Sequence, residues 1–148
     1  MRDSDTGIEF RQATIEEIFE LRFAVLRPGQ APVKLYFPGD GGMPPGTWHF
    51  GAFLGVRNVG CLTLLAAEWE GRAALQLRGM AVAAELRGRG VGRGLLQAAG
   101  AGAEGAAALW WCNARVEAVG FYERNGWRVV SEEFMVAGVG RHRKMVRE

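Results

Sequence analysis

The sequence predicts a mixed α/β fold: a mostly antiparallel central sheet flanked by helices. Apolar residues recur at every second position in 48–56 and 59–67, as they do in strands, and at helical spacing in 15–25. Clusters of glycine, proline and asparagine separate such segments along the chain. Helices and strands that alternate in this way pack around one sheet, so we expect residues 1–148 to form a single domain.

The expected order of elements is strand, helix, long loop, three antiparallel strands, helix, strand, helix and two strands. The first helix begins after Thr14, because a threonine followed three residues later by Glu17 predicts a capping box. Pro28 ends that helix, and Gly126 caps the last one. The expected strands are 8–11, 48–56, 59–67, 75–82, 109–112, 127–136 and 143–146, with a turn at 57–58; the expected helices are 15–25, 95–109 and 116–125.

A long loop is expected between the first helix and the second strand. Residues 28–46 hold all five prolines of the chain and five of its glycines. Loops of this length in compact domains are often lids or substrate-binding elements. We therefore expect this loop to shape a substrate site, with the apolar residues Leu35, Tyr36 and Phe37 in contact with the substrate.

Composition and charge argue against several classes of partner. The formal net charge is only +2, so we expect no nucleic-acid partner. Cys61 and Cys112 lie in apolar runs without other ligands at metal spacing, which predicts reduced core thiols and no metal site. The polar, acidic start and the lack of a long apolar run predict neither a signal peptide nor a membrane partner, and hence a cytoplasmic protein.

Residues 80–96, MAVAAELRGRGVGRGLL, place alternating arginines and glycines between two apolar segments. The glycine spacing does not fit a Rossmann fingerprint, and the Gly-Lys-Ser/Thr of a Walker loop is absent. An RNA-binding Arg-Gly tract and a purely structural tight turn remain as alternatives. The third reading is a strand-to-helix turn, in which free helix N–H groups and nearby arginines bind phosphate while the glycines let a diphosphate approach.

Two segments carry a resemblance to a known family. Residues 87–92, RGRGVG, match the Q/R-x-x-G-x-G/A diphosphate loop of the GNAT superfamily of acetyl-CoA-dependent N-acetyltransferases. Residues 118–127, AVGFYERNGW, resemble the later A-x-x-F-Y-x-x-x-G-F segment of that family, and the element order resembles its fold. The resemblance implies acetyl-CoA as acetyl donor, with CoA as product, and a cofactor site made by Met80, Ala81, Val82, Arg87, Gly88, Arg89, Gly90, Val91, Gly92 and Arg93. Where the family often has an asparagine, this chain has Arg115, with Asn113 nearby, and both are candidate cofactor contacts.

The resemblance also implies a mechanism of direct attack by an amine on the thioester. Backbone N–H groups of 80–82 would stabilise the oxyanion, and Tyr122 would protonate the CoA thiolate; the alternative is that Tyr122 only packs its helix on the sheet. The amine must lose a proton before it attacks. His49 and His142 are the candidate bases, with Glu68, Glu132 and Glu133 as weaker ones.

Two functions remain open. One is an N-acetyltransferase that acts on a primary amine of a small molecule or peptide, and the other is a non-catalytic acyl-CoA-binding sensor. A tyrosine at position 122 favours the enzyme, because a sensor needs no proton donor. The acceptor stays unidentified, and the oligomeric state, a homodimer included, stays open.

Overall fold

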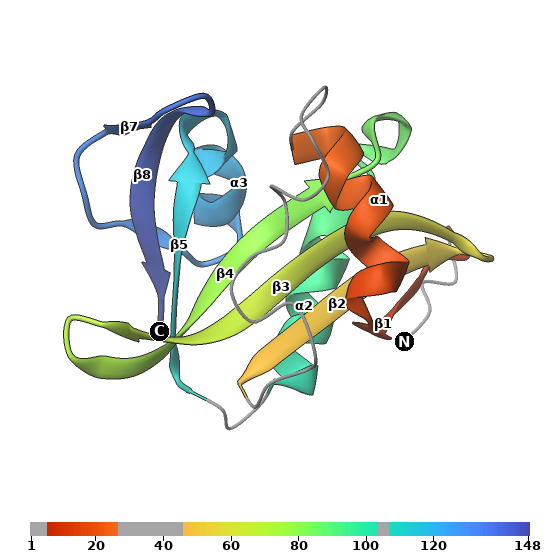
Figure 1. The fold of residues 1–148 in the computed structure, drawn as a ribbon, viewed down its shortest axis with the longest axis horizontal. Helices are drawn as coiled ribbons and strands as arrows, with labels where there is room; N and C mark the ends of the chain where they lie inside the picture. The colour runs from red at the N-terminus through yellow and green to blue at the C-terminus, as the bar shows by residue number, and fades with distance from the viewer. Residues whose placement is uncertain (1–5, 27–45, 104–106) are drawn as a thin grey trace.

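The computed structural model describes residues 6–26, 46–103 and 107–148, and it confirms the predicted fold class (Figure 1). The strands are β1 (Glu9–Ala13), β2 (Thr47–Leu54), β3 (Arg57–Trp69), β4 (Arg72–Val82), β5 (Leu109–Arg115), β6 (Arg128–Val129), β7 (Phe134–Val136) and β8 (Gly140–Arg147). The helices are α1 (Ile15–Leu26), α2 (Val91–Gly102) and α3 (Val119–Arg124), with 3-10 turns η2 (Ala84–Leu86) and η3 (Val116–Ala118).

Within the described part of the chain, the strands form one sheet in the order β1-β2-β3-β4-β5-β8-β6, and β7 also pairs with β8. Every pairing is antiparallel except that of β4 with β5, which is parallel. A parallel pair needs a crossover, and the segment with α2 supplies it. The mostly antiparallel sheet that the sequence predicts is therefore confirmed.

The parallel strands β4 and β5 pair over only part of their length. Residues 74–77 of β4 pair with residues 109–112 of β5, and the two strands diverge beyond Leu77 and Cys112. Figure 1 shows them together at one end and apart at their carboxyl ends. The carboxyl end of β4 therefore has a backbone edge that β5 does not cover.

A β-bulge in β4 lies beside this divergence. Cys61 of β3 pairs with Ala81 and Thr63 pairs with Arg78, so two β4 residues stand opposite Leu62 alone. Gly79 is one of the two and has φ +61°, a conformation that residues with a Cβ rarely adopt. The bulge increases the local twist and turns the end of β4 away from β5.

Helices cover both faces of the sheet (Figure 1). Helix α1 lies on one face, where Ile15 and Ile18 pack with Phe53, Cys61 and Ala81. On the other face, α2 and α3 bury a larger core, which includes Phe10, Phe50, Leu62, Leu64, Leu75, Leu95, Trp110, Tyr122, Trp127 and Met145. The diverging strands thus lie between two covered faces.

The predicted ends of two helices are confirmed. The backbone N–H of Thr14 donates to Glu17 Oε1 at 2.9 Å, and the N–H of Glu17 donates to Thr14 Oγ1 at 3.3 Å, which is the reciprocal capping box. After α3, Gly126 has φ +92° and the N–H of Trp127 donates to the Tyr122 carbonyl at 3.1 Å.

Several boundaries differ from the prediction. The turn between β2 and β3 lies at Gly55 and Val56 and not at 57–58. The segment expected as one strand, 127–136, forms the short strands β6 and β7. Helix α2 begins at Val91 and ends at Gly102, whereas the sequence predicts 95–109. Its glycines weaken helix propensity, but Gly94 and Gly102 let the rings of Phe10 and Phe50 pack directly on the helix.

The loop expected to bind substrate, 28–46, lies outside the described residues apart from Gly46. Across the described ranges, no helix is long and apolar enough to cross a membrane.

Candidate active site

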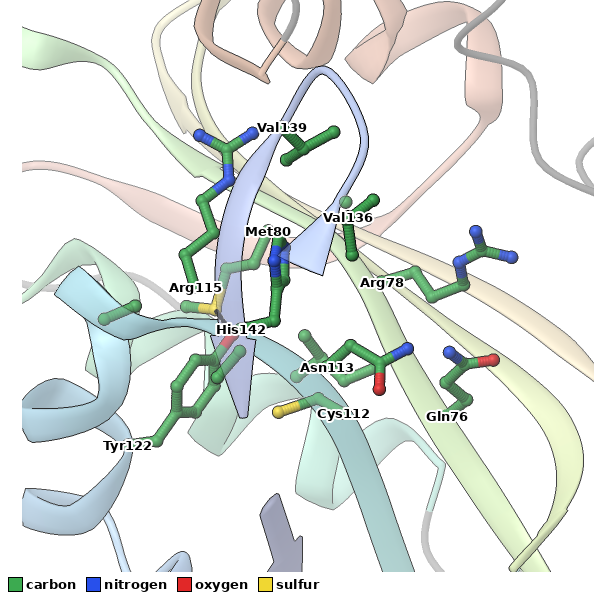
Figure 2. Close-up of a pocket in the computed structure, with 14 residues that line it drawn as sticks. Gln76, Arg78, Met80, Cys112, Asn113, Arg115, Tyr122, Val136, Val139 and His142 are labelled. Atoms are coloured by element: carbon green, nitrogen blue, oxygen red, sulfur yellow. Dashed lines mark hydrogen bonds between the residues drawn. The ribbon is translucent and has the colours of Figure 1, made fainter. Parts of the chain in front are cut away.

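A cavity of about 230 Å³ lies where β4 and β5 diverge, and we call it the β4–β5 cavity (Figure 2). Its described lining comes from β4, β5, η3, α3 and the segment from β7 to β8. The lining residues are Gln76, Leu77, Arg78, Gly79, Met80, Cys112, Asn113, Ala114, Arg115, Ala118, Tyr122, Val136, Val139 and His142. Five residues that the sequence singles out therefore meet at one place: Met80, Asn113, Arg115, Tyr122 and His142.

Tyr122 enters the β4–β5 cavity from α3. Its hydroxyl donates to the Sδ atom of Met80 at 3.6 Å, and Figure 2 shows it directed toward the bulged part of β4. The ring packs edge-on against Phe121 and Trp127, which hold its position. Burial raises the pKa of the Tyr122 hydroxyl well above its usual range, and Cys112 adds to the rise. The hydroxyl therefore keeps its proton at neutral pH.

His142 enters the same cavity from β8. Its Nδ1 lies 2.9 Å from the Gly140 carbonyl oxygen. A carbonyl only accepts hydrogen bonds, so Nδ1 carries a proton and the neutral ring has its lone pair on Nε2. The ring stacks on Phe134 and is 6% exposed, so its orientation is constrained. This tautomer leaves Nε2 able to accept a proton.

Asn113 and Arg115 lie on the β5 side of the cavity. In the sheet register, Asn113 is opposite Lys144 and Arg115 is opposite His142, so these four side chains share one face of the sheet. The Lys144 ammonium donates to Asn113 Oδ1 at 2.9 Å. The structure therefore groups Asn113 and Arg115 with His142 around the cavity.

Residues 87–93, which we call the diphosphate loop, follow η2 and include the first residues of α2. Gly88 has φ +78° and Gly90 has φ +82°, and at neither position would a Cβ meet another atom within 4 Å. Gly90 is the N-cap of α2, no side chain caps that helix, and its first turn contains no acidic residue. The N–H groups of Val91 and Gly92 are among those that precede the first intrahelical bond, Gly94 N–H to Gly90 O at 3.0 Å. Such a helix start fits an anion.

Gly92 in the diphosphate loop is a glycine for a different reason than the sequence suggests. The sequence predicts that its missing side chain leaves room for a diphosphate. A Cβ at this position would instead lie 2.9 Å from Cζ of Phe121 and 3.3 Å from Cε of Met80. Gly92 therefore allows α2 to pack closely against α3 and β4.

His49 lies apart from the β4–β5 cavity. It is 1% exposed, and its Nδ1 lies 2.8 Å from Thr63 Oγ1, which accepts a hydrogen bond from Arg22 Nη2 of α1 at 2.6 Å. The structure thus brings His142, and not His49, to the cavity with Tyr122. Glu68, Glu132 and Glu133 are exposed and are not among the described lining residues.

Cys112 lines the cavity but is not a reactive thiol. Burial raises the pKa of its thiol to about 12, so it stays neutral at neutral pH. Cys61, under α1, has a pKa of about 12 for the same reason. Both cysteines are free and buried, which agrees with the predicted core thiols.

Some residues that line the cavity were not found from the sequence. Gln76 and Arg78 line the cavity, and their alternation in β4 with buried Leu75 and Leu77 was the available signal. Val136 and Val139 come from the β7–β8 hairpin, for which the sequence had no signal.

A second groove, of about 480 Å³, lies between α2 and α3 and is lined in part by Arg93, Arg124 and Arg147.

Comparisons with known proteins agree with this geometry. The family model described as "Acetyltransferase (GNAT) domain" matches residues 46–129, more than half of the chain. The N-acetyltransferase YitI of Bacillus subtilis (strain 168), named as uncharacterised, is 29% identical over 91% of this chain and 92% of its own length.

Solved structures share the fold. The crystal structure of Escherichia coli ElaA has a TM-score of 0.79 at 20% identity, over 95% of this chain and 99% of that one. A GNAT family acetyltransferase from Elizabethkingia anophelis, with acetyl-CoA bound, has a TM-score of 0.67 at 16% identity, over 95% of this chain and 97% of that one. With the diphosphate loop and the diverging strands inside the matched region, the chain belongs to the GNAT acetyltransferase family, and the predicted GNAT-type N-acetyltransferase is confirmed.

Proposed function

We propose that residues 1–148 form a single catalytic domain, which transfers an acetyl group from acetyl-CoA directly to a primary amine of a small molecule or peptide. The observation that carries the proposal is the meeting of Tyr122 and His142 in the β4–β5 cavity. One group holds a proton and the other can accept one, and acyl transfer from a thioester to an amine needs both.

The diphosphate loop and the edge of β4 fit acetyl-CoA. Bound there, acetyl-CoA would supply the activated acetyl group. The amides at the start of α2 would hold the diphosphate, and the exposed side chains of Arg87, Arg89 and Arg93 would add positive charge. The backbone of 80–82, along the β4 edge that β5 leaves uncovered, would bind the pantetheine arm and stabilise the oxyanion.

The groove between α2 and α3 suits the nucleotide end of CoA, which carries a further phosphate. Arg93 belongs both to the diphosphate loop and to this groove, so the two lie next to each other. Arg124 and Arg147 add two guanidinium groups to its lining. Guanidinium groups bind phosphate oxygens in a two-pronged geometry.

The residues of the cavity would divide the proton transfers between them. Nε2 of His142, directly or through water, takes the proton from the acceptor amine, because Nδ1 is already protonated toward Gly140. Tyr122 donates a hydrogen bond and then its proton to the departing sulfur. Burial keeps Tyr122 protonated until that charge develops, and the same dry surroundings raise the proton affinity of the thiolate.

Direct transfer is favoured over a covalent acetyl-enzyme. Cys112 is the cysteine of the described lining, and with a pKa of about 12 it supplies almost no thiolate at neutral pH. A thiol in that state is a poor nucleophile. The acetyl group would therefore pass to the amine in a complex that holds both substrates.

Calorimetry with CoA and acetyl-CoA, beside a free-thiol assay with a panel of amines, tests the proposal. We expect acetyl-CoA to bind and an amine to accelerate thiol release, without acetylation of the protein itself by intact-mass measurement. Binding without turnover across the panel would instead support the acyl-CoA sensor. A stable acetyl-enzyme on Cys112 would contradict direct transfer.

A further inference from the structure

The side chains of β5 alternate between the two faces of the sheet, and this alternation divides the β4–β5 cavity. Trp110, Cys112 and Ala114 belong to the core under α2 and α3, which also contains Tyr122. Successive side chains of a strand point to opposite faces, so Asn113 lies on the other face, the one on which α1 packs. The cavity therefore has an α3 side, with Tyr122, and an α1 side, with Asn113.

His142 and Lys144 lie on the same side of the cavity as Asn113. In the register of β5 and β8, Lys144 is opposite Asn113. His142 is opposite Arg115 in the same register, and residues that stand opposite each other share a face. Acetyl-CoA held at the start of α2 would enter from the α3 side, because Val91 of that first turn belongs to the core on that face. The α1 side, with the proposed base, is then left for the amine.

Asn113 is the first residue of β5 beyond its ladder with β4, whose last pair is Leu77 with Cys112. Its exposed side chain lines the cavity, and Figure 2 shows the amide nitrogen on the side of Gln76, which lines the cavity from β4. In the described part of the chain, this nitrogen donates no hydrogen bond to the protein. Its two N–H groups are therefore available to a ligand at the point where the strands separate.

Lys144 determines which end of the Asn113 amide faces the cavity. An ammonium can only donate, so the bond of 2.9 Å from Lys144 Nζ identifies the Asn113 atom it contacts as Oδ1. Nζ in turn lies 5.1 Å from the ring centre of Trp111 and 5.3 Å from that of Phe134. Cation–π contacts of this kind hold an ammonium in place. The amide is thus fixed with its oxygen toward β8 and its N–H groups toward the cavity.

We infer that Asn113 binds the acceptor and that Lys144 is the positioning residue that orients it. The N–H groups of Asn113 donate to an oxygen of the acceptor, a carbonyl or a hydroxyl near its amino group. This contact holds the amine on the side of His142 while the thioester approaches from the side of Tyr122. The family resemblance suggests Asn113 as a cofactor contact, and the face of β5 on which it lies argues against that role. The inference rests on the proposed function.

The experiment compares amines of similar shape with and without an oxygen, at saturating acetyl-CoA. Glycinamide is paired with isobutylamine, and ethanolamine with propylamine. The readout is the ratio of kcat/KM within a pair, relative to wild type, so that intrinsic differences between the amines cancel. Asn113→Ala should lower this ratio about tenfold, the loss expected when a hydrogen bond to an oxygen is removed. Asn113→Asp keeps the contact with Lys144 but places oxygen against oxygen, and should lower the ratio at least as much.

Variants of Lys144 separate positioning from folding. Lys144→Met keeps the packing on the rings but removes the donor, and should also lower the ratio, whereas Lys144→Arg keeps a cationic donor and should preserve most of it. In the Asn113→Ala background, Lys144→Met should have no further effect on the ratio, because Lys144 acts through Asn113. A residue that only stabilises the fold would affect both amines of a pair alike. Arg128→Gln, an exposed arginine on β6, is the control and should keep the wild-type ratio.

The outcomes separate the inference from the proposed function. An unchanged ratio in both Asn113 variants, or a weaker Kd for CoA in Asn113→Ala, overturns the inference and leaves the acetyltransferase proposal intact. If acetyl-CoA binds but no amine reacts, calorimetry of N-acetylglycinamide with the CoA-loaded protein decides it. Tighter binding to the wild type than to Asn113→Ala supports the inference, and equal or absent binding overturns it. A wild type that binds no acetyl-CoA contradicts the proposed function and the inference together.

Discussion

The hydroxyl oxygen of Tyr122 lies 3.6 Å from Sδ of Met80, across the space that opens between α3 and the bulged end of β4. A thioether is a weak acceptor, so little free energy is lost when the hydroxyl leaves Met80 for a better acceptor. Tyr122 is thereby placed beside the strand edge where the thioester is proposed to lie, with its proton retained by burial.

Replacement of Tyr122 by phenylalanine should lower kcat about 10²- to 10⁴-fold, because the proton donor is lost while the ring is kept. The Kd for acetyl-CoA, measured by calorimetry, should stay within error. Phe10→Leu, whose ring packs on Gly94 of α2 and is not among the described lining residues, serves as the packing control and should affect stability more than kcat. A Tyr122→Phe variant at the wild-type rate would mean that Tyr122 only packs.

Gly90→Ala should weaken CoA binding, because the new Cβ extends into the open space where a diphosphate is proposed to lie. The positive φ also adds strain of about 1 kcal/mol. Gly71→Ala is the matched control: Gly71 has φ +79° and equally open surroundings, but it lies in the β3–β4 turn. Equal loss of CoA affinity in both variants would argue against the loop assignment.

Gly92→Val should instead unfold at a lower temperature than the wild type, because its side chain would collide with Phe121 and Met80. Overpacking of this kind typically costs about 1–3 kcal/mol. Chemical denaturation followed by tryptophan fluorescence measures the loss. Wild-type stability in this variant would show that α2 and α3 can separate at no cost.

His142→Gln should remove the acidic limb of the pH–rate profile, since a histidine base loses activity when the ring is protonated. The measurement is kcat/KM for an accepted amine from pH 5 to 9 with saturating acetyl-CoA. His49→Gln should keep that limb and lower thermal stability, because it disturbs a buried hydrogen bond to Thr63. Loss of the limb in His49→Gln alone would reverse the assignment of the base.

Glu17→Gln should destabilise the protein by about 0.5 kcal/mol at neutral pH, a small value because the Arg11–Glu17 pair is exposed to solvent. A hydrogen bond from Arg11 and the capping bond from Thr14 lower the pKa of Glu17 to about 2. A lowered pKa stabilises the fold above the ordinary carboxyl value and loses that effect as the pH falls toward 2. The stability difference between variant and wild type should therefore shrink between about pH 4.5 and pH 2. A constant difference would mean that the charge of Glu17 contributes nothing.

Features that depend on neighbours in the sequence were predictable. The capping box of Thr14 and Glu17 and the cap at Gly126 were predicted and are confirmed, because each depends on residues a few positions apart. The two segments that carry the family resemblance, 87–92 and 118–127, are also contiguous. A diphosphate loop and a helix with an aromatic pair can be recognised without knowing what they pack against.

Boundaries set by packing were not predictable in the same way. Gly92 and Gly94 made the first turn of α2 look like part of a loop, yet Gly94 accepts the ring of Phe10 and Gly92 that of Phe121. The free energy of that contact outweighs the low helix propensity of glycine. The segment 127–136 contains strand-forming residues, but only two short parts of it pair with β8.

The sequence by itself determined the fold class, the family and the proton donor candidate, because periodicity and short motifs reflect local backbone preferences and spacing. The tertiary structure alone separated His142 from His49. Both are lone histidines in strands, and only the pairing of β8 with β5 and β7 carries one of them to Tyr122, while the other packs against Thr63 beneath α1. The same pairing places Lys144 on Asn113, since residues about thirty positions apart become neighbours only through the sheet register.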